Sequence, residues 1–168
     1  MPEEIQTILV VDDHPLMRKG ILQLIAMESS LRLVGEAGDG ERGLALALRE
    51  RPDLILLDLN MRGLSGLDML KALKATDLDS RVIVLTFSDS EEDVAAALRS
   101  GADGYLIKDM EPEEVLHSLK IAAEGRIVLG ERVAKILADA LRHESQSKPA
   151  DSVQFTGRER EILALIAV

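Results

Sequence analysis

The 168-residue sequence has no cysteine and no tryptophan, and its aromatic residues are limited to two phenylalanines and one tyrosine. A chain without cysteine forms no disulfides and holds no metal through thiolates. So few aromatic rings argue against sites built on stacking, such as those that bind flavins or single-stranded nucleic acids. No apolar run approaches about 18 residues and no signal-peptide core is present, so we expect a soluble cytoplasmic protein without membrane association.

Positive charge is also scarce, because 20 lysines and arginines face 30 acidic residues and leave a formal net charge of −10. That balance argues against a surface for nucleic acid or anionic membranes within this chain. The hydrophobic content of 46% is enough for a substantial core, supplied mainly by Leu, Ile, Val and Ala. The length fits one ordinary domain of ~100–200 residues with a tail.

Short aliphatic runs alternate along the chain with segments whose apolar residues recur every three or four positions. The runs predict five strands, at residues 5–11, 31–37, 53–58, 81–87 and 104–108. Pro15 and Pro112 are typical of first helical turns, and Gly101 and Gly125 are typical of positions that follow helices. Such alternation indicates a parallel sheet with right-handed crossovers. We therefore predict a doubly wound α/β domain with a five-stranded parallel sheet.

The pattern changes after Gly130. Residues 131–142 carry an apolar helical face, and residues 143–154 are polar without an apolar period, as in flexible linkers. Thr156 and Glu159 match a capping box that opens another helix, whose apolar run has no stop signal before the chain ends. The sequence thus predicts a main domain (1–128), a linker helix with a flexible linker (129–154), and the truncated start of a helical domain (155–168).

Polar residues lie at or just after the carboxyl ends of four of the predicted strands, at the edge of the sheet where function gathers in open parallel sheets. They are Asp12, Asp13, Asp58, Asn60, Thr86 and Lys108. Carboxylates about 4 Å apart repel by roughly 1–4 kcal/mol at effective dielectrics of 80 to 20, so the cluster needs a cation. Because the candidate ligands are oxygens, Mg²⁺ fits. An aspartate beside it could then attack phosphorus as a nucleophile.

Each of these residues also has an ordinary structural explanation. Asp12 or Asp13 could cap the helix that begins at Pro15. Asp58 could be a strand-to-loop residue and Thr86 only a good strand former. Lys108 could be a solvated surface lysine, and Tyr105 a ring at the core's edge whose hydroxyl meets water. Agreement among four separate strand ends favours the functional interpretation for the set.

The segments that carry this chemistry resemble receiver domains of two-component response regulators. They read VVDDHPLMRKG, PDLILLDLNMRGLSGLDML, VIVLTFSD and GADGYLIKDMEPEE. The resemblance covers residues 5–125 and is strongest to the nitrate/nitrite-responsive NarL-type subfamily. The tail segment FTGREREIL resembles the start of that subfamily's LuxR-type helix-turn-helix domain.

The resemblance implies the receiver strand order 2-1-3-4-5 and a phospho-acceptor at Asp58. It implies that Asp13, Asp58 and the backbone carbonyl of Asn60 bind Mg²⁺, and that Asp12 holds a metal-bound water. Two departures touch the neighbouring loops. Arg62 stands where the family usually has Pro, which affects only the expected conformation of that loop. Asp109 follows Lys108 where many receivers have Pro, so the resemblance does not imply a cis-proline turn here.

The same resemblance implies that Lys108 contacts the phosphoryl group and that Thr86 and Tyr105 form a switch pair. The implied partners are a sensor histidine kinase, DNA bound through the complete C-terminal domain, and a second copy of the chain after phosphorylation. The implied chemistry is Mg²⁺-dependent self-phosphorylation with slow dephosphorylation, not turnover by a conventional enzyme. Phe155 replaces the usual Leu of the helix-turn-helix segment and keeps that position apolar.

Three other functions remain as alternatives. A phosphohydrolase of the haloacid-dehalogenase kind also forms an aspartyl-phosphate, but its second carboxylate acts as a general acid, and Asn60 stands there. A stand-alone interaction module would signal only through the receiver surface, which the residues after Gly130 argue against. A flavodoxin-like flavin binder would share the fold, but fold alone implies no function and aromatic residues are scarce.

Overall fold

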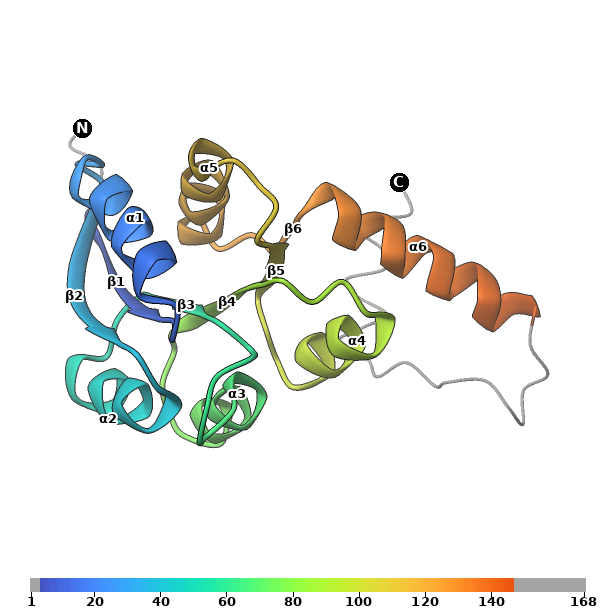
Figure 1. Ribbon diagram of the computed structural model, residues 1–168, viewed down its shortest axis with the longest axis horizontal. Coiled ribbons are helices and arrows are strands. Elements are labelled where there is room, and N and C mark those ends of the chain that lie inside the picture. The colour runs from blue at the N-terminus through green and yellow to red at the C-terminus, as the bar shows by residue number, and fades with distance from the viewer. Residues whose placement is uncertain (1–3, 147–168) are drawn as a thin grey trace.

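The computed structural model describes residues 4–146 (Figure 1). In chain order its elements are β1 (Gln6–Val11), α1 (Pro15–Ala26), β2 (Leu31–Ala37), α2 (Gly40–Glu50), β3 (Leu54–Leu57), α3 (Gly66–Lys74), β4 (Arg81–Thr86), α4 (Glu91–Arg99), β5 (Gly104–Ile107), α5 (Pro112–Ala123), β6 (Val128–Leu129) and α6 (Glu131–Gln146). The alternating pattern of the sequence therefore corresponds to alternating strands and helices. Among these residues no helix is both long and apolar enough to cross a membrane.

The strands form one parallel sheet in the order β2-β1-β3-β4-β5-β6. The five predicted strands and the order 2-1-3-4-5 are confirmed, because β6 only adds to the edge beyond β5. Two residues of β6 pair with Gly104 and Tyr105. So short a strand carries too little pattern to be predicted, since alternation needs at least four residues to stand out.

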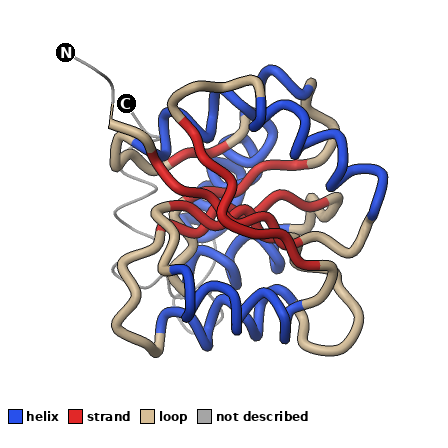
Figure 2. Tube along the Cα trace, turned by 90° about the vertical axis from the view of Figure 1, so that its left-hand side faces the viewer, coloured by secondary structure: helices blue, strands red, loops and turns tan. Residues whose placement is uncertain are grey.

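The helices cover both faces of the sheet, as a doubly wound fold requires (Figure 2). Helices α1 and α5 pack on one face through buried residues such as Ile25 and Leu119. Helices α2, α3, α4 and α6 pack on the other face, with Met69, Leu98 and Leu137 among their buried residues. The linker helix thus belongs to the core, because α6 lies beside α4 and covers the far edge of the sheet.

Strand β3 explains the continuous aliphatic run of the sequence. Leu54 and Leu56 belong to one hydrophobic cluster, and Ile55 and Leu57 belong to the other. A strand buried on both faces has no polar side to alternate with, so all four positions are apolar. The run ends where the strand reaches the edge of the sheet.

The predicted helix boundaries agree with the structure at several positions. Pro15 and Pro112 begin α1 and α5, and Gly101 and Gly125 follow α4 and α5 with φ of 106° and 91°. These left-handed conformations suit glycine, which has no Cβ to clash. The linker helix, predicted at 131–142, extends to Gln146. The helix expected at 155–168 and most of the flexible linker lie outside the described residues, and the predicted domain boundaries remain predictions.

Candidate functional site

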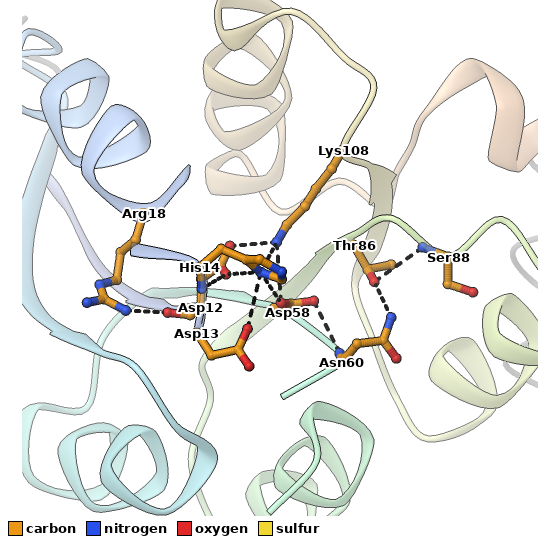
Figure 3. Close-up of polar contacts among 9 residues, drawn as sticks. All are labelled: Asp12, Asp13, His14, Arg18, Asp58, Asn60, Thr86, Ser88 and Lys108. Carbon is orange, nitrogen blue, oxygen red and sulfur yellow. Dashed lines mark hydrogen bonds and ion pairs between the residues drawn. The ribbon is translucent and has the colours of Figure 1, made fainter. Parts of the chain in front are cut away.

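The carboxyl ends of β1, β3, β4 and β5 bring four of the predicted residues together (Figure 3). Asp12 directly follows β1, Asp58 follows β3 and Lys108 follows β5, while Thr86 is the last residue of β4. All four are buried. The parallel register places these strand ends next to one another, which is why residues up to 96 positions apart in sequence meet.

Lys108 is the cation of the site. Its ammonium lies 2.8 Å from Asp12 Oδ2 and 3.3 Å from Asp58 Oδ2, and its side chain is fully buried. The Nζ atom also lies 5.1 Å from the ring centroid of Phe87. The alternative of a solvated surface lysine is therefore wrong. Buried charge–charge contacts with two carboxylates hold the ammonium in place and fix the orientation of the Lys108 side chain.

Asp58 has few partners for a carboxylate that is 2% exposed. Its Oδ1 accepts one hydrogen bond from the Asn60 backbone N–H at 3.2 Å, and its Oδ2 faces Lys108. Burial raises the pKa of the Asp58 carboxyl above its ordinary value of 3.8, and Asp12 acts in the same direction, while Lys108 opposes them. The Asp58 carboxylate is thus less stabilised than one with several N–H donors.

Gly66 lets the first turn of α3 approach Asp58 closely. A Cβ atom at residue 66 would overlap the Asp58 carbonyl oxygen and the Leu59 backbone. The Gly66 N–H donates to the Leu59 carbonyl at 3.0 Å, which ties the loop after β3 to the start of α3. The absence of a side chain at residue 66 is therefore part of how the fold positions Asp58.

Asp12 and Asp13 begin the loop that leads into α1, but neither caps that helix. The cap residue is His14, which makes no capping bond through its side chain, so the capping alternative is wrong. Asp12 Oδ1 instead accepts the His14 backbone N–H at 2.8 Å, and Arg18 donates to the Asp12 carbonyl. Asp13 Oδ1 is buried with no hydrogen-bond partner among the described residues.

His14 is a site residue that the sequence reasoning missed. Its Nδ1 atom lies 3.0 Å from Asp12 Oδ1, 3.1 Å from Asp13 Oδ1 and 3.3 Å from Asp58 Oδ2. His14 lies three residues beyond Val11, the last residue of β1, and was not among the polar residues predicted for this edge of the sheet. The available signal was its position directly after two aspartates.

Thr86 and Tyr105 meet through Ser88, in the loop after β4. Thr86 Oγ1 accepts the Asn60 side-chain amide at 3.2 Å and the Ser88 N–H at 3.4 Å. The Tyr105 hydroxyl donates to the Ser88 carbonyl at 2.9 Å. The ring is fully buried and burial raises the pKa of the Tyr105 phenol, so the expectation that its hydroxyl meets water is wrong. The two side chains of the predicted switch pair therefore hold opposite sides of Ser88.

The four side chains suited to hold a metal ion come from Asp12, Asp13, His14 and Asp58, whose candidate ligand atoms lie within 4.8 Å of one another. Three are carboxylates, the ligand type that Mg²⁺ prefers. Asp13 Oδ1 fits such an ion, because it is a buried acceptor that no hydrogen-bond donor of residues 4–146 satisfies. The Asn60 side-chain N–H donates to Thr86 Oγ1, and the backbone carbonyl of Asn60 is the ligand that the receiver resemblance implies.

Comparison with known proteins gives consistent matches. The family model of the response regulator receiver domain matches residues 8–120. The nitrate/nitrite response regulator protein NarL of Escherichia coli K12 is 50% identical over 165 residues, which is 98% of this chain and 76% of that protein. A nitrate/nitrite response regulator homolog of Haemophilus influenzae is 42% identical over 160 residues, covering 95% and 74%.

Among solved structures, the signal receiver domain of the response regulator NarL from Mycobacterium tuberculosis has a TM-score of 0.71 to this chain. It is 36% identical, and the match covers 74% of this chain and 100% of that one.

Proposed function

The chain belongs to the response regulator receiver family, and we propose that it accepts a phosphoryl group from a sensor histidine kinase on Asp58. The observation that carries this proposal is the buried Asp58 carboxylate, which shares the Lys108 ammonium with Asp12 and accepts one backbone N–H from the described residues. In the proposal, phosphorylation controls transcription through a LuxR-type DNA-binding domain that begins in the tail.

The transfer step is a nucleophilic displacement at phosphorus. An oxygen of Asp58 forms the new bond while the bond from phosphorus to the donor's imidazole nitrogen breaks, and the electron pair leaves with the imidazole. The raised pKa of the Asp58 carboxyl marks an under-stabilised anion, which favours attack over a carboxylate satisfied by many donors. Lys108, 3.3 Å from Asp58 Oδ2, is placed to compensate the charge of the incoming phosphoryl oxygens.

Asp12, Asp13, Asp58 and the Asn60 carbonyl would hold Mg²⁺, which supplies further charge neutralisation when bound. Asp12 also positions Lys108 through their 2.8 Å contact. The phosphohydrolase alternative is disfavoured by residue 60, because the amide of Asn60 has no acidic proton for a leaving group and is engaged with Thr86. Slow loss of the phosphoryl group to water is consistent with a site that lacks this acid.

The switch that we propose begins at Thr86. A phosphoryl group on Asp58 brings strong acceptor oxygens, and the Thr86 hydroxyl can donate to them. Movement of Thr86 would pull Ser88 through the hydrogen bond that the Ser88 N–H donates to Thr86 Oγ1. The Tyr105 hydroxyl holds the other side of Ser88 through its hydrogen bond to the Ser88 carbonyl. The loop between β4 and α4 then has two arrangements, which the phosphoryl group biases by differential contacts.

Arg132 would carry this change to the linker helix. It is on α6 and pairs at 2.5 Å with Asp89, which follows Ser88, and at 2.5 Å with Asp109, which follows Lys108. Both loops of the site are thereby tied to the first turn of α6. Homodimer formation after phosphorylation, DNA binding by the complete protein and control of DNA access through the linker belong to the same proposal.

The test is covalent labelling with a small acyl-phosphate donor and Mg²⁺. One phosphoryl group should be added, detected by intact mass, and it should be lost with hydroxylamine. Asp58→Asn and chelation of Mg²⁺ should each reduce labelling to background. Asp103→Asn is the matched control, because Asp103 is also buried and receives the same substitution at the opposite end of the sheet. Full labelling of Asp58→Asn would contradict the assignment.

The switch is tested by amide hydrogen exchange of the labelled protein. Phosphorylation of the wild type should alter exchange over residues 87–107. Thr86→Ala should still accept the phosphoryl group, because Asp58 and Lys108 are intact, but should lose the change over that segment. An unaltered response in Thr86→Ala would remove Thr86 from the mechanism.

A further inference from the structure

We propose that His14 is a built-in competitor for the cation of the acidic pocket. In the metal-free protein its ring lies among the three carboxylates, with Nδ1 hydrogen-bonded to Asp12 Oδ1, and the ring moves out when Mg²⁺ binds. His14 thereby weakens the affinity of the pocket for Mg²⁺. This inference rests on the proposed function, because it concerns the metal that phosphorylation of Asp58 requires.

The contacts of the ring carry the first step. One atom, Nδ1, lies 3.0–3.3 Å from oxygens of Asp12, Asp13 and Asp58. An ionised carboxylate only accepts hydrogen bonds, so the hydrogen in the 3.0 Å contact with Asp12 Oδ1 belongs to Nδ1. Lys108 Nζ, 3.3 Å away from Nδ1, already has Asp12 Oδ2 and Asp58 Oδ2 as acceptors. The ring therefore serves as a second donor among three mutually repelling groups.

Competition follows from the shared oxygens. A cation bound to the same three carboxylates uses the oxygens that now face Nδ1, and the two cannot occupy the centre of the group together. Mg²⁺ takes oxygen ligands and water, whereas imidazole suits later transition metals. We therefore assign His14 the role of an occupant that Mg²⁺ displaces, not that of a Mg²⁺ ligand.

The ring is also free to leave. Its side chain is 47% exposed, and it makes no capping bond to α1, so its departure leaves the helix start intact. On the outer side it meets the Phe87 ring edge-on, with centroids 5.9 Å apart. Phe87 is itself 59% exposed and does not enclose the His14 ring. The barrier to outward rotation is therefore the set of contacts with the carboxylates.

The size of the effect follows from population arithmetic. The apparent dissociation constant of Mg²⁺ is the intrinsic constant divided by the fraction of protein whose ring is out of the pocket. A single net hydrogen bond to a charged group makes that fraction roughly one tenth. Removal of the ring should therefore tighten Mg²⁺ binding by about tenfold.

The experiment is a titration with MgCl₂ at one fixed pH, followed by the backbone amide resonances of Asp13 and Asn60. His14→Ala should bind Mg²⁺ about tenfold more tightly than the wild type. His117→Ala is the matched control, because His117 is exposed on α5, and it should bind as the wild type does. The same dissociation constant in all three proteins would overturn this inference and leave the proposed function standing.

Two further outcomes are also decisive. Weaker binding by His14→Ala would mean that the imidazole is a ligand of the metal and would overturn the competitor role. Failure of every protein to bind Mg²⁺ would overturn the metal requirement of the proposed function as well. A direct readout is the ring contact between His14 and Phe87: its nuclear Overhauser effects should be present without metal and lost at saturating Mg²⁺. Persistence of those effects at saturation would contradict displacement.

Discussion

The acidic residues at the two ends of the parallel sheet differ in how many hydrogen-bond donors they have. At the amino end, Asp53 accepts the Thr7 N–H at 2.8 Å and the Thr7 hydroxyl at 3.0 Å. Asp103 accepts the Val82 N–H at 2.9 Å and the Lys74 ammonium at 3.1 Å. Each carboxylate at this end has donors of its own, which tie one strand to the next.

At the carboxyl end, Asp12, Asp13 and Asp58 share the Lys108 ammonium and the His14 ring. Asp13 Oδ1 has no hydrogen-bond partner among the described residues. Asp103 is buried and yet has donors of its own, so burial of a carboxylate does not by itself mark a functional site. A functional site is marked instead by several carboxylates that crowd together with too few donors, because their repulsion lowers stability unless a bound ligand neutralises it.

Removal of the lysine at each end should have the largest effect on this contrast. Lys108→Met leaves two buried carboxylates without their ammonium and should lower the free energy of unfolding of the metal-free protein by about 3 kcal/mol. Lys74→Met should cost about 1 kcal/mol or less, because Lys74 is 30% exposed and Asp103 keeps the Val82 N–H. Urea denaturation in the presence of a chelator measures both.

Added Mg²⁺ provides the internal control for the two lysine variants. It should restore part of the lost stability of Lys108→Met, because a cation replaces the missing positive charge. Mg²⁺ should not restore the stability lost in Lys74→Met, because the carboxylate next to Lys74, Asp103, does not share its donors with other carboxylates of the described residues. Equal losses in the two variants would mean that the two ends of the sheet do not differ in the way described.

Neutralising one aspartate at each end should change stability in opposite directions. Asp58→Asn relieves the repulsion from Asp12 and should raise the free energy of unfolding of the metal-free protein by about 1 kcal/mol. Asp103→Asn removes the negative charge that pairs with Lys74 and one of the two acceptor oxygens, and should lower the free energy of unfolding by about 1–2 kcal/mol. A loss of stability in Asp58→Asn would mean that the contact with Lys108 outweighs the crowding.

The difference in unfolding free energy between the wild type and Asp58→Asn should depend on pH. The pKa of the Asp58 carboxyl is raised in the folded protein, so its protonated form is favoured by folding. The wild type therefore keeps this stability below pH 3.8 and loses it as the pH rises through the raised pKa. Asp58→Asn does not titrate, so its advantage over the wild type should grow with pH across that window. Urea denaturation at a series of pH values checks this.

The sequence was sufficient for the parts of the site that topology determines. Asp12, Asp58, Thr86 and Lys108 could be placed together because alternating strands and helices imply a parallel sheet whose strand ends share one edge. The segment from Asp53 to Asp58 shows the limit of residue type, since both ends are aspartates but Asp53 precedes β3 and Asp58 follows it. Direction along the strand, not composition, separates the structural residue from the functional one.

Side-chain directions could not be predicted, because they depend on neighbours from other elements. Nδ1 of the His14 ring lies 3.1 Å from Asp13 Oδ1 and 3.3 Å from Asp58 Oδ2, and the second contact joins elements far apart in the sequence. The Tyr105 hydroxyl finds the Ser88 carbonyl, which another loop brings to it. Strand β6 was missed because two residues carry no period, and pairing with β5 alone makes it a strand.

The smallest expected effect concerns the link from the carboxyl end of the sheet to α6. Arg132 pairs with Asp89 and Asp109, but all three side chains are about half exposed, so the pairs contribute little to global stability. Arg132→Gln should leave the urea midpoint within error and accelerate amide exchange only in the first turn of α6. Lys135→Gln, an exposed position one turn further along α6, is the matched control and should leave exchange unchanged.

Salt should distinguish this link from the buried pairs of the site. At about 1 M salt the screening length falls to ~3 Å, so the wild type should approach Arg132→Gln in its exchange over the first turn of α6. The contacts of Lys108 with Asp12 and Asp58 are buried and should respond far less to the same salt. If exchange in α6 is insensitive to both salt and Arg132→Gln, apolar packing of α6 against α4 and β5 alone holds the linker helix, and the two loops of the site reach it by another route.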